Sequence, residues 1–65
     1  MDLEFLKIRR KEKGLTQNDL STHFGYSRQN YSQKEIGKQR FKLEEIRELM
    51  NILSLTPEEI VRIFL

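Results

Sequence analysis

The sequence predicts an all-α fold in which five short helices pack into one compact domain over residues 1–65. Capping residues and glycines divide the chain into five segments, and apolar residues recur at helical spacing where a segment is long enough to show it. No cysteine is present, so the fold must rest on helix packing alone. No repeat or linker rich in Pro, Gly or Ser interrupts the chain, so a second domain has no place to begin.

Each of the first two helices begins at a side chain that can cap it and finishes at a glycine free to take the left-handed conformation. The predicted ranges are residues 2–13 and 16–24. The residues that mark these ends are Asp2 and Gly14 for the first helix, and Thr16, Asp19 and Gly25 for the second. Thr and Asp at this spacing form a capping box, with Asp in place of the usual Glu.

The third helix follows the second almost at once. Only Tyr26 separates Gly25 from Ser27, which can cap a helix that ends near Glu35 or Ile36. Two helices joined by so tight a glycine turn must cross steeply.

A basic loop over residues 38–42, KQRFK, lacks helical periodicity and separates the third helix from the last two. The fourth helix is predicted over residues 43–53 from apolar recurrence. Its periodic residues are Leu43, Ile46, Leu49, Met50 and Leu53. Thr56, Pro57 and Glu59 then open the last helix with a cap, a first-turn proline and a capping-box glutamate.

Length and composition exclude several classes of function. A chain of 65 residues has no room for a catalytic cleft and a second module, so no enzymatic activity is expected. His23 is the lone histidine and has no second ligand at metal spacing, so neither a metal nor a cofactor is expected. No segment has the apolar length of a signal peptide or a membrane span. We expect a cytoplasmic protein with no membrane partner and no small-molecule ligand.

The net charge of +2 conceals an uneven distribution. Residues 1–42 hold ten Lys or Arg against five Asp or Glu, whereas residues 43–65 hold two against five. Positive charge gathered in one part of a chain is typical of a protein that binds a polyanion, although many helical domains have lopsided, solvated charges.

The third helix divides its side chains by direction. Tyr31 and Glu35 are in line with Ser27 and are expected to face the body of the domain. The opposite face carries hydrogen-bonding side chains, which are Arg28, Gln29, Ser32 and Gln33. Arg pairs with the two acceptors of guanine and Gln with the acceptor and donor of adenine. This face therefore suits reading of a DNA major groove, but an ordinary solvated helix face has the same composition.

The run GLTQNDLSTHFGYSRQNYSQKEIGK resembles the helix-turn-helix of the phage repressor and Cro class, the XRE-like family with the λ-repressor fold. The resemblance covers about residues 6–60. The shared features are a Thr-Gln pair, a turn glycine, a serine cap, an apolar residue and a closing Glu and Gly. These are Thr16, Gln17, Gly25, Ser27, Tyr31, Glu35 and Gly37, all at the family spacing.

The resemblance implies a phage or bacterial transcription regulator of the repressor kind. Such a protein binds a palindromic operator in double-stranded DNA as a homodimer, at the nucleoid of a bacterial cell. The implied base-reading residues are Arg28, Gln29 and Gln33, with Ser32 as a further candidate. The implied phosphate-contacting residues are Gln17, Lys38, Arg40 and Lys42, with Asn30 as a further candidate. The family's pairing of the first and third helices implies an ion pair between Arg10 and Glu35.

Three residues depart from the family pattern. Ser21 stands where the family prefers Ala against the crossing helix, a small change. Lys34 stands where an apolar or aromatic residue usually helps to hold the third helix in place, which leaves the tilt of that helix open. Ser54 replaces the common glycine between the last two helices, which predicts a strained or differently shaped turn.

The last helix is apolar over a wider arc than the core of so small a domain needs. Ile60, Ile63 and Phe64 form one stripe, and Val61 and Leu65 broaden it. Exposed apolar patches commonly mark an interface. The predicted interface is that of a homodimer, through Ile60, Val61, Phe64 and Leu65. Two alternatives stay open: the helix folds back on the core, or the chain is a protein-interaction module such as an antitoxin or anti-repressor.

Phe41, in the basic loop, is either a core residue or an exposed contact. Burial is favoured, because large aromatic side chains are usually buried in small domains.

Overall fold

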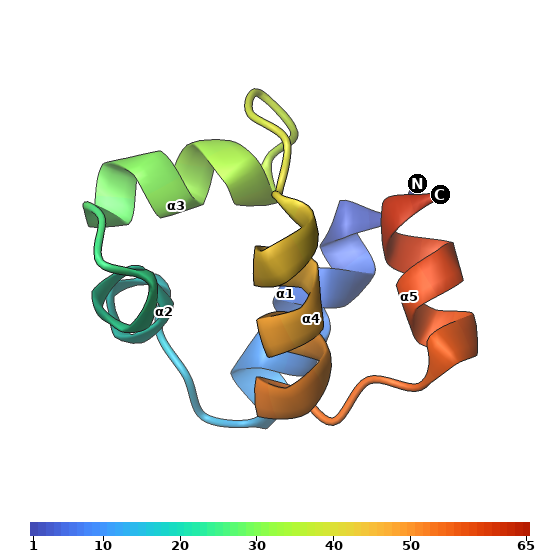
Figure 1. The fold of residues 1–65 in the computed structure, drawn as a ribbon. Coiled ribbons are helices and arrows are strands. Elements are labelled where there is room, and N and C mark those ends of the chain that lie inside the picture. Colours follow the sequence, from blue (N-terminus) through green and yellow to red (C-terminus); the bar gives the residue numbers. More distant parts are fainter.

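The computed structural model describes residues 1–65 as five α-helices joined by short connections (Figure 1). The helices are α1 (Leu3–Glu12), α2 (Gln17–Phe24), α3 (Arg28–Glu35), α4 (Leu43–Ile52) and α5 (Pro57–Phe64). The structure contains no strand, so the predicted all-α fold is confirmed. None of the five helices combines the length and the apolar character that crossing a membrane requires.

The helix ends lie at or within one residue of the predicted positions because the capping chemistry acts as expected. Four caps accept a backbone N–H three residues on, and these caps are Asp2, Thr16, Ser27 and Thr56. The turns after α1 and α2 pass through Gly14 and Gly25, whose φ angles are 72° and 83°. A side chain at either glycine would be strained in this left-handed conformation.

The turn between α4 and α5 carries the strain that its missing glycine predicts. Ser54 has a φ of 53° and is the one residue other than glycine with a positive φ. The left-handed conformation costs a residue with a Cβ roughly 1 to 2 kcal/mol. The Ser54 hydroxyl accepts a hydrogen bond from Lys13 at 3.3 Å, but this exposed contact offsets little of that cost.

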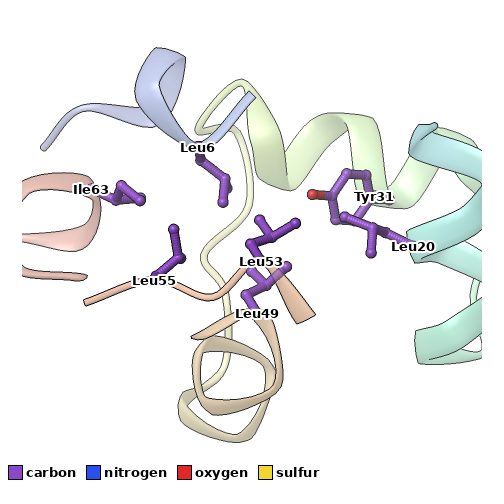
Figure 2. Packing of buried hydrophobic residues seen from close by; sticks show 7 residues of the cluster. All are labelled: Leu6, Leu20, Tyr31, Leu49, Leu53, Leu55 and Ile63. Atoms are coloured by element: carbon purple, nitrogen blue, oxygen red, sulfur yellow. The ribbon is translucent and has the colours of Figure 1, made fainter. Parts of the chain in front are cut away.

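One apolar core joins all five helices. Figure 2 shows its seven buried side chains, which are Leu6, Leu20, Tyr31, Leu49, Leu53, Leu55 and Ile63. Leu49 and Leu53 lie in the middle of this view, with the pair of Leu20 and Tyr31 on one side and Ile63 on the other. The core therefore bridges the α2–α3 pair to α5 through α4.

The two ends of the chain meet beside α5. The Asp2 backbone N–H donates to the Ile63 carbonyl at 3.0 Å, and the Arg62 side chain donates to the Asp2 carboxylate at 2.9 Å. Figure 1 shows both termini at the same end of α5, which lies on the side of the molecule away from α2. The contacts between the two chain ends therefore lie on the side of the molecule away from α2.

Candidate nucleic-acid interface

The α3 helix is held on the body of the protein by Tyr31, which is fully buried. The Tyr31 ring stacks on Phe24 of α2 with centroids 6.5 Å apart and meets Phe41 edge to face at 6.0 Å. Ser21 of α2 is also buried, and its hydroxyl donates to the Asn18 carbonyl at 2.9 Å. A serine is therefore small enough for this crossing and keeps its polar group satisfied.

A buried ion pair ties the end of α3 to α1. The Arg10 guanidinium donates to both carboxylate oxygens of Glu35 at 3.0 Å, and both side chains are more than nine-tenths buried. A third Arg10 bond reaches the Leu15 carbonyl at 2.8 Å. Burial acts to raise the pKa of Glu35, but the bonds from Arg10 and Gln17 outweigh it and hold the pKa below its ordinary value. Glu35 is therefore ionised at neutral pH.

A second buried ion pair, which sequence reasoning missed, ties α3 to α4. The Lys34 ammonium lies 2.8 and 3.0 Å from the two carboxylate oxygens of Glu45 and 5.0 Å from the centroid of the Tyr26 ring. Glu45 also accepts the backbone N–H of Lys42 at 2.7 Å, which caps α4. The sequence signal that could have indicated this pair is Glu45 itself, an acid at the capping-box position of α4. Lys34 thus holds α3 against α4 through an ion pair, at a position where the family resemblance predicts an apolar or aromatic residue.

The opposite face of α3 is open to solvent. Arg28, Gln29 and Asn30 are exposed, while Ser32 and Gln33 are half-buried. The side chains of Arg28 and Gln29 make no hydrogen bond or ion pair within the protein. The Gln33 amide oxygen accepts from the Gln39 amide at 2.7 Å, so this side chain is linked to the loop that follows.

Gln17 lies at the first position of α2 and is half-buried. Its amide nitrogen donates to Glu35 at 3.2 Å. An amide carries two N–H groups, so one donor remains for an outside oxygen. Glu35, which is held by Arg10, therefore orients the Gln17 side chain at the start of α2.

The basic loop leaves the end of α3 and projects beyond it in Figure 1. Lys38, Arg40 and Lys42 are exposed and form no ion pair within the protein. Phe41 is partly buried between them, and its ring meets Phe64 edge to face at 5.6 Å. Of the two alternatives for Phe41, packing on the core is the one observed. The aromatic ring anchors a loop whose cations face solvent.

A family model described as a helix-turn-helix domain matches residues 4–63. The chain belongs to the helix-turn-helix domain family. This family lies in the XRE/Cro-like group, so the resemblance of the sequence to that group is confirmed. Neither the curated proteins nor the solved structures gave a match. In this helix-turn-helix domain α2 and α3 are the paired helices, and the family supports a regulator that binds DNA.

Two further features concern His23 and the apolar arc of the last helix. His23 on α2 is exposed, and its Nε2 atom lies 2.6 Å from a carboxylate oxygen of Glu48 on α4. On α5, Ile60 and Phe64 are half-buried against the core. The exposed apolar side chains here are Val61 on α5, at 54%, and Leu65, which directly follows α5, at 84%.

Proposed function

We propose that this chain is a transcription regulator that binds double-stranded DNA in a sequence-specific way, as a phage or bacterial repressor of the Cro/CI-like kind. The observation that carries the proposal is the division of α3. One face is locked by Tyr31 and by two buried ion pairs, while Arg28 and Gln29 on the other face have no partner in the protein. A rigid helix with free bidentate side chains is what reading of base edges requires.

In this proposal Arg28, Gln29 and Gln33 read bases, with Ser32 beside them. Gln17, Asn30, Lys38, Arg40 and Lys42 contact phosphates. Phosphate contacts hold the protein on any duplex, whereas a base-edge contact is lost only for particular bases. The role is one of binding without catalysis, and the protein acts in the cytoplasm at the nucleoid.

The test is operator selection from randomised DNA with alanine variants of the base-reading residues. Arg28→Ala is expected to weaken binding to the selected operator by about 1 to 3 kcal/mol and to relax the preference at one base pair. Binding to unrelated DNA should change much less. Arg47→Ala is the matched control, because Arg47 is exposed on α4 and also lacks a partner. The assignment is wrong if variants at Arg28, Gln29 and Gln33 all keep the wild-type consensus.

We further propose that the protein binds a palindromic operator as a homodimer through α5. Val61 and Leu65 support this idea, because both apolar side chains are exposed to solvent and exposed apolar side chains commonly mark an interface. Dimers of this kind place two half-sites about 34 to 36 Å apart, one turn of DNA. The rival proposal, an antitoxin or anti-repressor, uses the same exposed residues to bind a different protein.

Val61→Glu combined with Leu65→Glu is expected to abolish self-association and cooperative binding to a palindrome. Thermal stability should change little, because both side chains are exposed. Sedimentation velocity measures the first effect and footprinting the second. Ile8→Glu, at an exposed apolar residue of α1, is the control and should leave both intact. A wild-type protein that stays monomeric and protects only single half-sites would contradict the dimer.

A further inference from the structure

A shallow furrow beside α3 is lined by basic and neutral polar residues, by the apolar Leu15 and by no acid. Its walls come from α1, from the turn that follows it, from the start of α2 and from the first residue of α3. The charged and amide side chains that line it are Lys7, Arg10, Lys11, Gln17, Asn18 and Arg28. Arg10 contributes little positive charge here because Glu35 neutralises it. The charge of the furrow therefore rests on Lys7 and Lys11, with Arg28, the proposed base-reading residue, at its border on α3.

These three cations differ from the basic residues that serve the fold. Arg9, on another face of α1, pairs with Glu12 at 3.0 Å and Glu59 at 3.9 Å. Arg10, Lys34 and Arg62 also pair with carboxylates. Lys7 and Lys11 have no such partner, and they stand four residues apart on one face of α1. Like charges at this spacing repel each other, so neither lysine gains a favourable side-chain pair from the other.

We propose that this furrow binds a segment of the DNA sugar-phosphate backbone, with Lys7 and Lys11 of α1 as phosphate-contacting residues. The inference rests on the proposed DNA-binding function and extends its contact surface to a helix outside the helix-turn-helix. The cations come from two helices, Lys7 and Lys11 from α1 and Arg28 from α3, and several separate cations suit a chain of phosphates better than a single anion. The amides of Gln17 and Asn18 line the same furrow and add neutral donors.

The position of the furrow agrees with the geometry of a duplex. Arg28 belongs both to the furrow and to the exposed face of α3, so a strand lying in the furrow borders the groove that α3 would read. The basic loop lies at the other end of α3. An eight-residue helix is about 12 Å long, which is also about the width of the major groove. Cations at both ends of α3 can therefore hold the backbone on either side of it.

The experiment measures binding to a mixed-sequence DNA duplex as a function of salt, between about 50 and 200 mM. Lys7→Gln/Lys11→Gln is expected to reduce the slope of log affinity against log salt by about two units, since each phosphate contact contributes about 0.9. Lys13→Gln/Arg47→Gln removes the same charge from exposed residues that line no part of the furrow. This control should keep the wild-type slope within error. Thermal unfolding of both variants checks that the fold is retained.

A third variant, Lys38→Gln/Lys42→Gln, tests the basic loop separately. A wild-type slope for the α1 variant, with a reduced slope for the loop variant, would overturn the inference and leave the proposed function standing. An equal reduction of the salt slope in the α1 variant and in the control would also overturn the inference, because net charge alone would then explain the effect. Failure of the wild-type protein to bind duplex DNA at all would instead remove the proposed function.

Discussion

Arg10→Met is expected to lower the free energy of unfolding by about 3 to 5 kcal/mol, because it leaves the Glu35 carboxylate buried without its partner. Stability of ordinary domains amounts to roughly 0.05 to 0.15 kcal/mol per residue, so this loss unfolds much of the population of so short a chain. Urea denaturation measures the effect. Arg9→Met is the matched control. Its partners are partly exposed, so the cost should stay near or below about 1 kcal/mol.

The pH dependence of this difference has a definite sign. In the wild-type protein the pKa of Glu35 is below its ordinary value of 4.5, so Glu35 contributes stability that is present above that value and lost as the pH falls through the folded pKa. In Arg10→Met, burial dominates and raises the pKa of Glu35. Acid then protonates the unpaired carboxylate and reduces the destabilisation of the variant. The stability gap should be widest at neutral pH, begin to narrow above pH 4.5 as Glu35 of the variant is protonated, and narrow further below pH 4.5 as the wild-type ion pair is lost. A gap that is independent of pH would show that Glu35 is not the stranded charge.

Lys34→Met is expected to have a comparable effect, up to about 3 to 5 kcal/mol, because Glu45 is 8% exposed and loses the ammonium that neutralises it. The double variant Lys34→Met/Glu45→Gln should recover most of this loss. It removes the stranded charge and keeps an amide oxygen for the backbone N–H of Lys42. Urea denaturation of both variants measures the recovery. If the double variant is no more stable than Lys34→Met, lost packing and not the stranded charge explains the cost.

Operator selection gives the Lys34 prediction a second readout. The Lys34 ammonium, in the last turn of α3, binds Glu45 of α4 and lies over the ring of Tyr26, which precedes α3. We expect Lys34→Met to broaden base preference along the operator as well as to weaken the fold, because the tilt of α3 is then less constrained. Lys34→Arg should retain the preference by keeping the charge. A variant that is destabilised but selects the wild-type consensus would confine Lys34 to a structural role.

The helices could be predicted from the sequence because their ends depend on neighbouring residues. A cap such as Thr16 and a turn glycine such as Gly25 act within one helical turn, so the local pattern contains all the information required. The strained turn at Ser54 is predictable in the same way, because the glycine that is common at this position is absent.

The site was less predictable because its positioning contacts join residues that are distant in sequence. Lys34 and Glu45 are eleven positions apart, and no helical periodicity brings them together. The link from Gln39 to Gln33 depends on the path of the loop, which no periodic pattern describes. The split of α5 between half-buried Phe64 and exposed Val61 depends on where the other helices lie. Such contacts follow from tertiary packing, whereas the ion pair of Arg10 with Glu35 was anticipated only through the family resemblance.

The meeting of the two chain ends bears on the order in which the molecule assembles. The α2 and α3 helices are neighbours along the chain, so their contacts close only short loops. The contact of α1 with α5 closes almost the whole chain, since Arg62 and Asp2 are sixty positions apart. The entropy lost in closing a loop grows with the logarithm of its length. Folding that begins at α2 and α3 and ends at α5 meets this cost last, when burial of Leu6 and Ile63 can offset it.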